Sequence, residues 1–157
     1  MKNKTNVMRI LDAARVSFEV REYEVDENNL AATHIAEEIG LMPEMVFKTL
    51  VARGDKSGPV VFCIPADLEI DLKKAAKVTG NKRLEMVAVK DLLALTGYIR
   101  GGCSPIGMKK KFPTYFSHLA AMQEKITISA GVRGAQLLLK TADLVAFVGA
   151  ILSDITV

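Results

Sequence analysis

Residues 97–114 are the most unusual stretch of the sequence, because they combine four of the eleven glycines, two of the five prolines and three consecutive lysines. Glycine permits close backbone approach and positive φ, and proline fixes a bend. The Gly-Gly-Cys-Ser-Pro segment at 101–105 therefore predicts a shaped loop whose main-chain N–H groups can point at a ligand. With Lys109, Lys110 and Lys111 close behind it, the loop suits an anionic ligand, phosphate first. The alternative is a surface turn followed by a solvated run of charge.

Lys48 is a second candidate, because the strand predicted over 46–52 places it on one face with Val46, Leu50 and Ala52. Lysine is rarely buried unless it is paired or functional. Lys48 is therefore either a cation held in a pocket or a lysine whose ammonium group reaches water at a strand end.

Cys103 is a candidate nucleophile, because loop amides and nearby lysines lower the pKa of a thiol. No histidine is obviously placed to serve it: His34 lies off the apolar face of its predicted helix, and His118 has no visible partner. Ser129-Ala130-Gly131 is a further polar break at a strand end. Because an antiparallel sheet can bring strand ends together, we expect Lys48, the glycine loop and Ser129 to lie near one another.

Several familiar sites are absent from the sequence. There is no Cys-x-x-Cys and no histidine pair at ligand spacing, so we expect no metal. There is no Gly-x-x-x-x-Gly-Lys-Ser/Thr loop, no Gly-x-Gly-x-x-Gly and no Gly-x-Ser-x-Gly motif. We therefore expect no bound cofactor.

The composition is that of an ordinary globular chain, and 157 residues suffice for one core, so we expect a single domain over 1–157. The longest stretch without a charged residue is 112–123, which is too short to span a membrane, and no signal peptide is visible. We expect two reduced cysteines and a cytoplasmic protein. The charge is unevenly distributed: residues 97–140 carry a net charge of +6, whereas the whole chain carries +3. A local positive charge of this kind favours a polyanionic partner.

The elements that position these residues follow from hydrophobic periodicity, caps and breakers. Helices are predicted over 5–16, 32–39, 71–78, 91–96 and from 141 to about 151, with Thr5, Asp71 and Thr141 as N-caps. Strands are predicted over 18–25, 46–52, 60–64, 84–89, 112–116, 125–129 and 135–139, while 117–123 is ambiguous. Hairpins outnumber βαβ units, so we expect an α+β fold with a curved, mostly antiparallel or mixed sheet, barrel-like and flanked by helices.

The chain resembles the YbaK/EbsC family of free-standing aminoacyl-tRNA deacylases, relatives of the editing domain of prolyl-tRNA synthetases. The resemblance runs from the first helix to the last. The residues that carry it are Phe47-Lys48-Thr49-Leu50, Asp71-Leu72-Lys73-Lys74, Gly97-Tyr98, Gly101-Gly102-x-Ser104-Pro105-x-Gly107, Lys109-Lys110, Pro113-Thr114 and Ser129-x-Gly131-x-Arg133-Gly134. The glycine loop is the most specific of these motifs.

The resemblance implies trans-editing, in which a wrong amino acid is removed from tRNA by hydrolytic or lyase-type ester cleavage, with Cys-tRNA(Pro) as the typical substrate. The family's functional positions fall on catalytic Lys48, Gly101 and Gly102, and on substrate-binding Tyr23, Thr49, Ser104, Ser129 and Gly131. Two positions depart from the family pattern: Gln136 replaces an aspartate of some members, and the region near Leu30 lacks a family aromatic. These departures bear on amino-acid preference.

The expected mechanism follows from this resemblance. Amides near Gly101 and Gly102 would stabilise the charge that develops on the ester carbonyl. Lys48 would hold the terminal phosphate or ribose, and backbone phosphates would meet the cations Arg100, Lys109, Lys110, Lys111 and Arg133. Family members acting on Cys-tRNA let the substrate thiol attack the carbonyl, which would leave Cys103 a bystander.

The expected partners are a mischarged tRNA(Pro) and prolyl-tRNA synthetase, with no DNA and no membrane. Two alternatives remain open from the residues: a deacylase of another mischarged tRNA, such as Ala- or Ser-tRNA, and a non-catalytic RNA- or nucleotide-binding module.

Overall fold

The computed structural model describes residues 3–157. The helices are α1 (Asn6–Ala13), α2 (Ala32–Glu38), α3 (Leu72–Thr79), α4 (Val89–Thr96) and α5 (Thr141–Val148), with 3₁₀ turns η1 (Pro43–Met45) and η2 (His118–Met122). The strands are β1 (Glu19–Glu22), β2 (Phe47–Gly54), β3 (Gly58–Pro65), β4 (Leu84–Met86), β5 (Thr114–Ser117), β6 (Lys125–Ser129), β7 (Ala135–Lys140) and β8 (Ile151–Ser153). In the part of the chain described, every helix is too short to cross a membrane.

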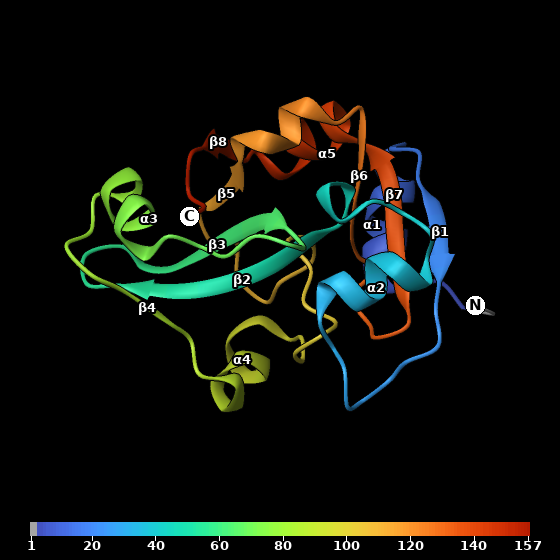
Figure 1. The fold of residues 1–157 in the computed structure, drawn as a ribbon, viewed down its shortest axis with the longest axis horizontal. Helices are drawn as coiled ribbons and strands as arrows, with labels where there is room; N and C mark the ends of the chain where they lie inside the picture. The colour runs from blue at the N-terminus through green and yellow to red at the C-terminus, as the bar shows by residue number, and fades with distance from the viewer. Residues whose placement is uncertain (1–2) are drawn as a thin grey trace.

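The strands form two sheets, one of order β1-β7-β6 and one of order β4-β2-β3-β5-β8 (Figure 1). The second sheet is mixed, since β2 is antiparallel to β3 and β4 whereas β5 is parallel to β3 and β8. A parallel bridge between Val46 and Thr127 joins the two sheets at the start of β2. The α+β fold with a mixed sheet is confirmed, but the sheets do not close into a barrel, because β4 and β8 remain edge strands among the described residues.

Strand β2 is covered on both faces. Phe47 and Val51 enter the main core, which α1, α5, β6 and β7 complete. Leu50 and Ala52 point the other way, into a second cluster formed with α3. The predicted alternation is confirmed, and Lys48 lies on the α3-facing side, at the end of the strand where that second cluster stops.

Helix starts follow the predicted caps in two cases out of three. Thr5 Oγ1 accepts a hydrogen bond from Met8 N at 3.3 Å, and Asp71 accepts from the first main-chain amides of α3. The prediction for Thr141 is wrong, because β7 pairs through Lys140 and Thr141 is already the first residue of α5. Its hydroxyl instead donates to the carbonyl oxygen of Gln123 at 2.7 Å.

The predicted extension of the last helix to about residue 151 is also wrong. Gly149 ends α5 with φ of +69°, and Ile151 belongs to β8, where it is 55% exposed. The extra strand pairs with β5 over only three residues.

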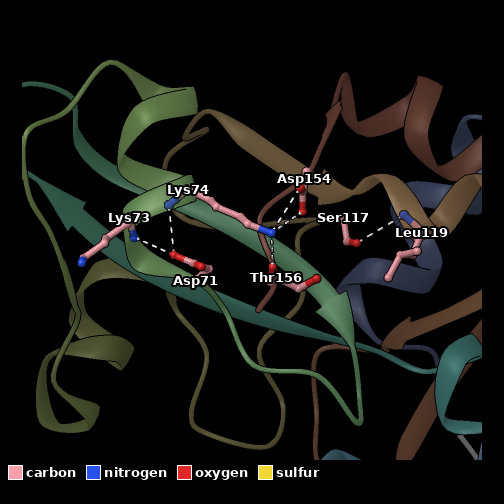
Figure 2. A network of polar contacts seen from close by, with 7 residues as sticks. All are labelled: Asp71, Lys73, Lys74, Ser117, Leu119, Asp154 and Thr156. Atoms are coloured by element: carbon pink, nitrogen blue, oxygen red, sulfur yellow. Dashed lines mark hydrogen bonds and ion pairs between the residues drawn. The ribbon is translucent and has the colours of Figure 1, made fainter.

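Residues 154–157, the C-terminal segment, contact α3 and the chain that follows β3 (Figure 2). Lys74 Nζ donates to both carboxylate oxygens of Asp154, at 3.1 and 3.2 Å, and to the carbonyl oxygen of Thr156 at 2.9 Å. The main-chain N–H of Val157 donates to the carbonyl oxygen of Glu69. Residues 66–70, which reach the site described next, are thereby fixed in place.

Candidate functional site

A cavity of about 460 Å³ opens between the start of α2, the first residues of β2, the chain after β3 and the glycine loop. Of the residues predicted to form the site, Lys48, Thr49, Arg100, Gly101 and Ser129 line this cavity. They come from β2, from the loop after α4 and from the end of β6. The Val46–Thr127 bridge places the end of β6 beside the start of β2. The expected proximity of Lys48, the glycine loop and Ser129 is confirmed.

Lys48 supplies a fixed cation to the cavity. Its Nζ donates to the carbonyl oxygen of Ala66 at 3.2 Å and lies 3.9 Å from Oε1 of Glu69, and the side chain is 24% exposed. This geometry follows from the β2–β3 register, which pairs Lys48 with Ile64, so the chain leaving β3 passes directly over the ammonium group. Two oxygen atoms therefore orient the ammonium group while part of it stays open to a ligand.

The hydroxyl groups of the cavity are held by local contacts. Thr49 Oγ1 lies 3.5 Å from Sγ of Cys63 on the neighbouring strand. Ser129 Oγ accepts a hydrogen bond from the main-chain N–H of Gly131 at 3.0 Å, so Gly131 orients Ser129 and does not itself line the cavity.

The glycine loop packs against the turn between β6 and β7. A Cβ atom on Gly102 would lie only 3.1–3.2 Å from main-chain atoms of Val132 and Arg133, so a larger residue there would push the loop and the turn apart by a few tenths of an ångström. Arg133 Nε fixes the contact by donating to the carbonyl oxygen of Arg100 at 2.8 Å.

The two glycine amides of the loop differ in availability. The N–H of Gly102 donates to the carbonyl oxygen of Ile99 at 3.0 Å and is occupied. For Gly101, which lines the cavity with φ of +87°, no partner of the N–H occurs among residues 3–157. Among the described residues, the N–H of Gly101 is therefore without a protein partner beside the cavity, whereas Gly102 allows the close packing against the turn.

Cys103 also lines the cavity, but its thiol is a poor nucleophile. Burial raises the pKa of Cys103 to about 12, and a hydrogen bond with Thr96 offsets only part of that rise. The loop amides and lysines thus fail to lower the thiol pKa, because desolvation of the thiolate is the larger effect. At neutral pH this cysteine is protonated.

Two predicted substrate-binding residues lie behind the cavity wall. Ser104 is fully buried, and its Oγ accepts from the N–H of Ile106 at 3.4 Å, which shapes the loop. Tyr23 packs against the apolar cluster beneath α2, formed by Ile35, Ala36 and their neighbours.

The predicted RNA-binding cations fall into two groups. Arg100 lines the cavity, and Arg133 lies beside it, with its Nε donating to the carbonyl oxygen of Arg100. Lys109 folds back and donates to the carbonyl oxygen of Ala94. Lys110 and Lys111 line a separate cavity of about 240 Å³ between α1 and α5.

Sequence reasoning did not single out Asp67, Glu69 or Thr33, which also line the cavity. The two acids directly follow β3, and the register of the hairpin could have placed them over Lys48. Gln136, noted as a departure from the family, is 4% exposed, lines the cavity, and accepts a hydrogen bond from Thr127 Oγ1 at 3.0 Å. An uncharged side chain thus fills this part of the wall.

Three comparisons place this geometry among known proteins. The chain is 51% identical over 136 residues to EbsC of Enterococcus faecalis, a proposed Cys-tRNA(Pro)/Cys-tRNA(Cys) deacylase, with 87% of this chain and 83% of that protein covered. It is 27% identical over 116 residues to a proline–tRNA ligase of Thermodesulfovibrio yellowstonii, covering 74% of this chain and 19% of the ligase. A solved structure of a proposed trans-editing enzyme for prolyl-tRNA synthetase has the same fold, with a TM-score of 0.84, 22% identity and 99% of each chain covered.

The model of the aminoacyl-tRNA editing domain matches residues 26–147, which include α2, the Lys48 strand, the glycine loop and Ser129. Together with the relationship to EbsC over most of both chains, this match means that the protein belongs to the aminoacyl-tRNA editing domain family.

Proposed function

We propose that the protein is an aminoacyl-tRNA deacylase that acts in trans, with cysteine on tRNA(Pro) as its preferred substrate. The observation that carries this proposal is the ammonium group of Lys48, held in a cavity that an unpaired loop amide and a buried serine also line. A cation and an amide donor on neighbouring walls suit the two charges of the reaction, a terminal phosphate and a developing oxyanion.

Each group of the site then has a separate role. Lys48 holds the phosphate or ribose of the terminal nucleotide, and the Gly101 amide meets the ester carbonyl oxygen as it becomes negative. Arg100 and Arg133 receive the adjoining backbone phosphates. Thr49 and Ser129 contact the aminoacyl group beside Gln136, whose uncharged amide replaces a carboxylate there.

The attacking atom comes from the substrate. Both protein thiols, at Cys63 and Cys103, have their pKa raised to about 12 by burial, and no histidine is among the residues that line the described cavity. The thiol sulfur of the esterified cysteine attacks its own carbonyl carbon, and the bond from that carbon to the ribose oxygen breaks. The thiol proton ends on the ribose oxygen, so the products are a cyclic thiolactone and tRNA with a free hydroxyl group.

Asp67 and Glu69 supply the carboxylates that line the described cavity, and we assign them the transfer of the thiol proton. Similarity to a proline–tRNA ligase supports prolyl-tRNA synthetase as the source of the mischarged tRNA. We further propose that residues 1–157 act as one editing domain in the cytoplasm.

A panel of charged tRNAs tests the proposal. Purified protein should release amino acid from Cys-tRNA(Pro) faster than from Ala-tRNA(Pro) or Ser-tRNA, and S-methylation of the esterified cysteine should stop the reaction. Cleavage of the S-methylated substrate at an equal rate would mean that water, and not the substrate thiol, is the attacking group. No cleavage of any charged tRNA, with tRNA binding retained, would reject the enzyme in favour of an RNA-binding module.

A further inference from the structure

A second basic surface lies at the end of the β2–β3 hairpin opposite to Lys48. Residues 72–84 contain five lysines and arginines and no acidic residue. Four of these, Lys73, Lys77, Lys82 and Arg83, line a groove of about 490 Å³ between α3 and β4. Figure 1 shows α3 at the end of the hairpin that is far from α2. We call this surface the α3–β4 groove.

Among the described residues, no carboxylate forms an ion pair with the cations of the α3–β4 groove. In residues 3–157 no ion pair involves Lys73, Lys77, Lys82 or Arg83, whereas the neighbouring Lys74 is held by Asp154. Glu85 is the one acidic residue that lines the groove in the described part of the chain. Unpaired cations in a concave surface favour an anionic partner.

The groove also has a rigid base. Asp55 Oδ1 accepts the main-chain N–H groups of Lys82 and Arg83, at 3.0 and 3.2 Å. Asn81 Oδ1 accepts those of Lys56 and Ser57, both at 2.9 Å. The turn after α3 is thereby fixed to the tip of the hairpin by hydrogen bonds to its main chain, which leaves the basic side chains available.

We propose that the α3–β4 groove binds backbone phosphates of the same tRNA whose 3′ end enters the Lys48 cavity, an inference that rests on the proposed function. Strand β2 runs from Lys48 to Gly54, which pairs with Leu84 at the groove. At about 3.3 Å per residue, the two sites lie roughly 20 Å apart along this strand. A polynucleotide can span that distance, so the groove adds affinity for the tRNA without contacting the ester.

The test removes charge and keeps side-chain length. The variant is Lys73→Gln/Lys77→Gln/Lys82→Gln, and the matched control is Lys90→Gln/Lys125→Gln/Lys140→Gln, which removes three exposed lysines from other surfaces. Binding of uncharged tRNA(Pro) is measured from 50 to 200 mM KCl, and deacylation is measured on Cys-tRNA(Pro) and on the cysteinyl ester of adenosine. A phosphate contact contributes about 0.7 to 0.9 to the slope of log affinity against log salt.

We expect the groove variant to bind tRNA roughly 10- to 50-fold more weakly and with a salt slope shallower by about 2. Its KM for Cys-tRNA(Pro) should rise while kcat, and cleavage of the adenosine ester, match the control. Binding and slope equal to the control would overturn the groove proposal. If the wild type cleaves no ester but the groove variant still loses tRNA affinity, the proposed deacylase activity is rejected, whereas tRNA binding by the α3–β4 groove is supported.

Discussion

At the residue scale, we propose that Lys48 and the Gly101 amide carry the catalysis and that Cys103, whose thiol is buried, takes no chemical part. Cys103 looks reactive in the sequence, because lysines and glycines surround it. In the structure Cys103 is only 8% exposed, and the cost of desolvating a thiolate raises the pKa of Cys103 to about 12. Neighbouring residue types alone do not report this burial.

Cys103→Ala should therefore leave deacylation of Cys-tRNA(Pro) within about threefold of the wild type, since a protonated thiol contributes no nucleophile. Single-turnover rates of the two proteins provide the measurement. A loss of a hundredfold or more in a variant that is still folded would restore Cys103 as a catalytic group.

At the element scale, the glycine loop is held beside the cavity because it packs against the turn between β6 and β7. Gly102→Ala would put a Cβ atom against the main chain of Val132 and Arg133, so the loop must retreat. Because a shift of a few tenths of an ångström relieves this contact, we expect a loss of about 1–3 kcal/mol in the free energy of unfolding and roughly 10-fold in activity, less than the roughly 100-fold that a shift of about 1 Å costs. Urea titration and single-turnover kinetics measure these two effects.

Gly40→Ala is the matched control for that variant. Gly40 has φ of +70°, and a Cβ atom there would meet no other atom within 4 Å, so alanine costs stability through backbone strain alone. Its activity should stay at the wild-type level at temperatures where it is folded. Equal activity losses in both glycine variants would mean that the contact between the loop and the turn is not the cause of the loss in Gly102→Ala.

The C-terminal segment is the element that supports the wall carrying Asp67 and Glu69. Ile155 is fully buried against the second cluster, so Ile155→Ala should lower the free energy of unfolding by about 2–5 kcal/mol. Asp154→Asn removes an exposed ion pair with Lys74 and should cost less than about 1 kcal/mol. Denaturant unfolding of the two variants compares them; the reverse order would mean that the ion pair, and not the buried side chain, holds the segment.

At the scale of the whole molecule, the sequence predicts most of the elements and the proximity of the main site residues, because caps, glycine stops and alternation are local signals. Thr5, Asp71, the β2–β3 hairpin and strand β6 fall as predicted. It does not predict β8, whose three residues pair only with a strand distant in sequence. That pairing is long-range, and no local pattern encodes it.

The two buried thiols also set a pH dependence for the whole fold. In the folded protein the pKa of Cys63 and of Cys103 is about 12, above the ordinary value of 9.0, so only the unfolded chain loses these protons as pH rises through 9. Stability from these groups is complete below pH 9 and falls between pH 9 and 12, by about 1.4 kcal/mol per thiol at pH 10. Urea unfolding at pH 8 and pH 10 should show this loss, and it should be smaller in Cys63→Ala/Cys103→Ala; equal losses in both proteins would assign it to other groups.

Single-turnover deacylation of Cys-tRNA(Pro) by Lys48→Ala tests most directly whether the Lys48 ammonium group positions an aminoacyl-tRNA ester in the cavity. Lys90→Ala, on an exposed face of α4, is the control. We predict that Lys48→Ala stays folded, because the side chain contributes only a partly exposed pair, and that its rate falls by roughly 100-fold or more. A rate for folded Lys48→Ala equal to those of Lys90→Ala and the wild type would contradict this role of Lys48.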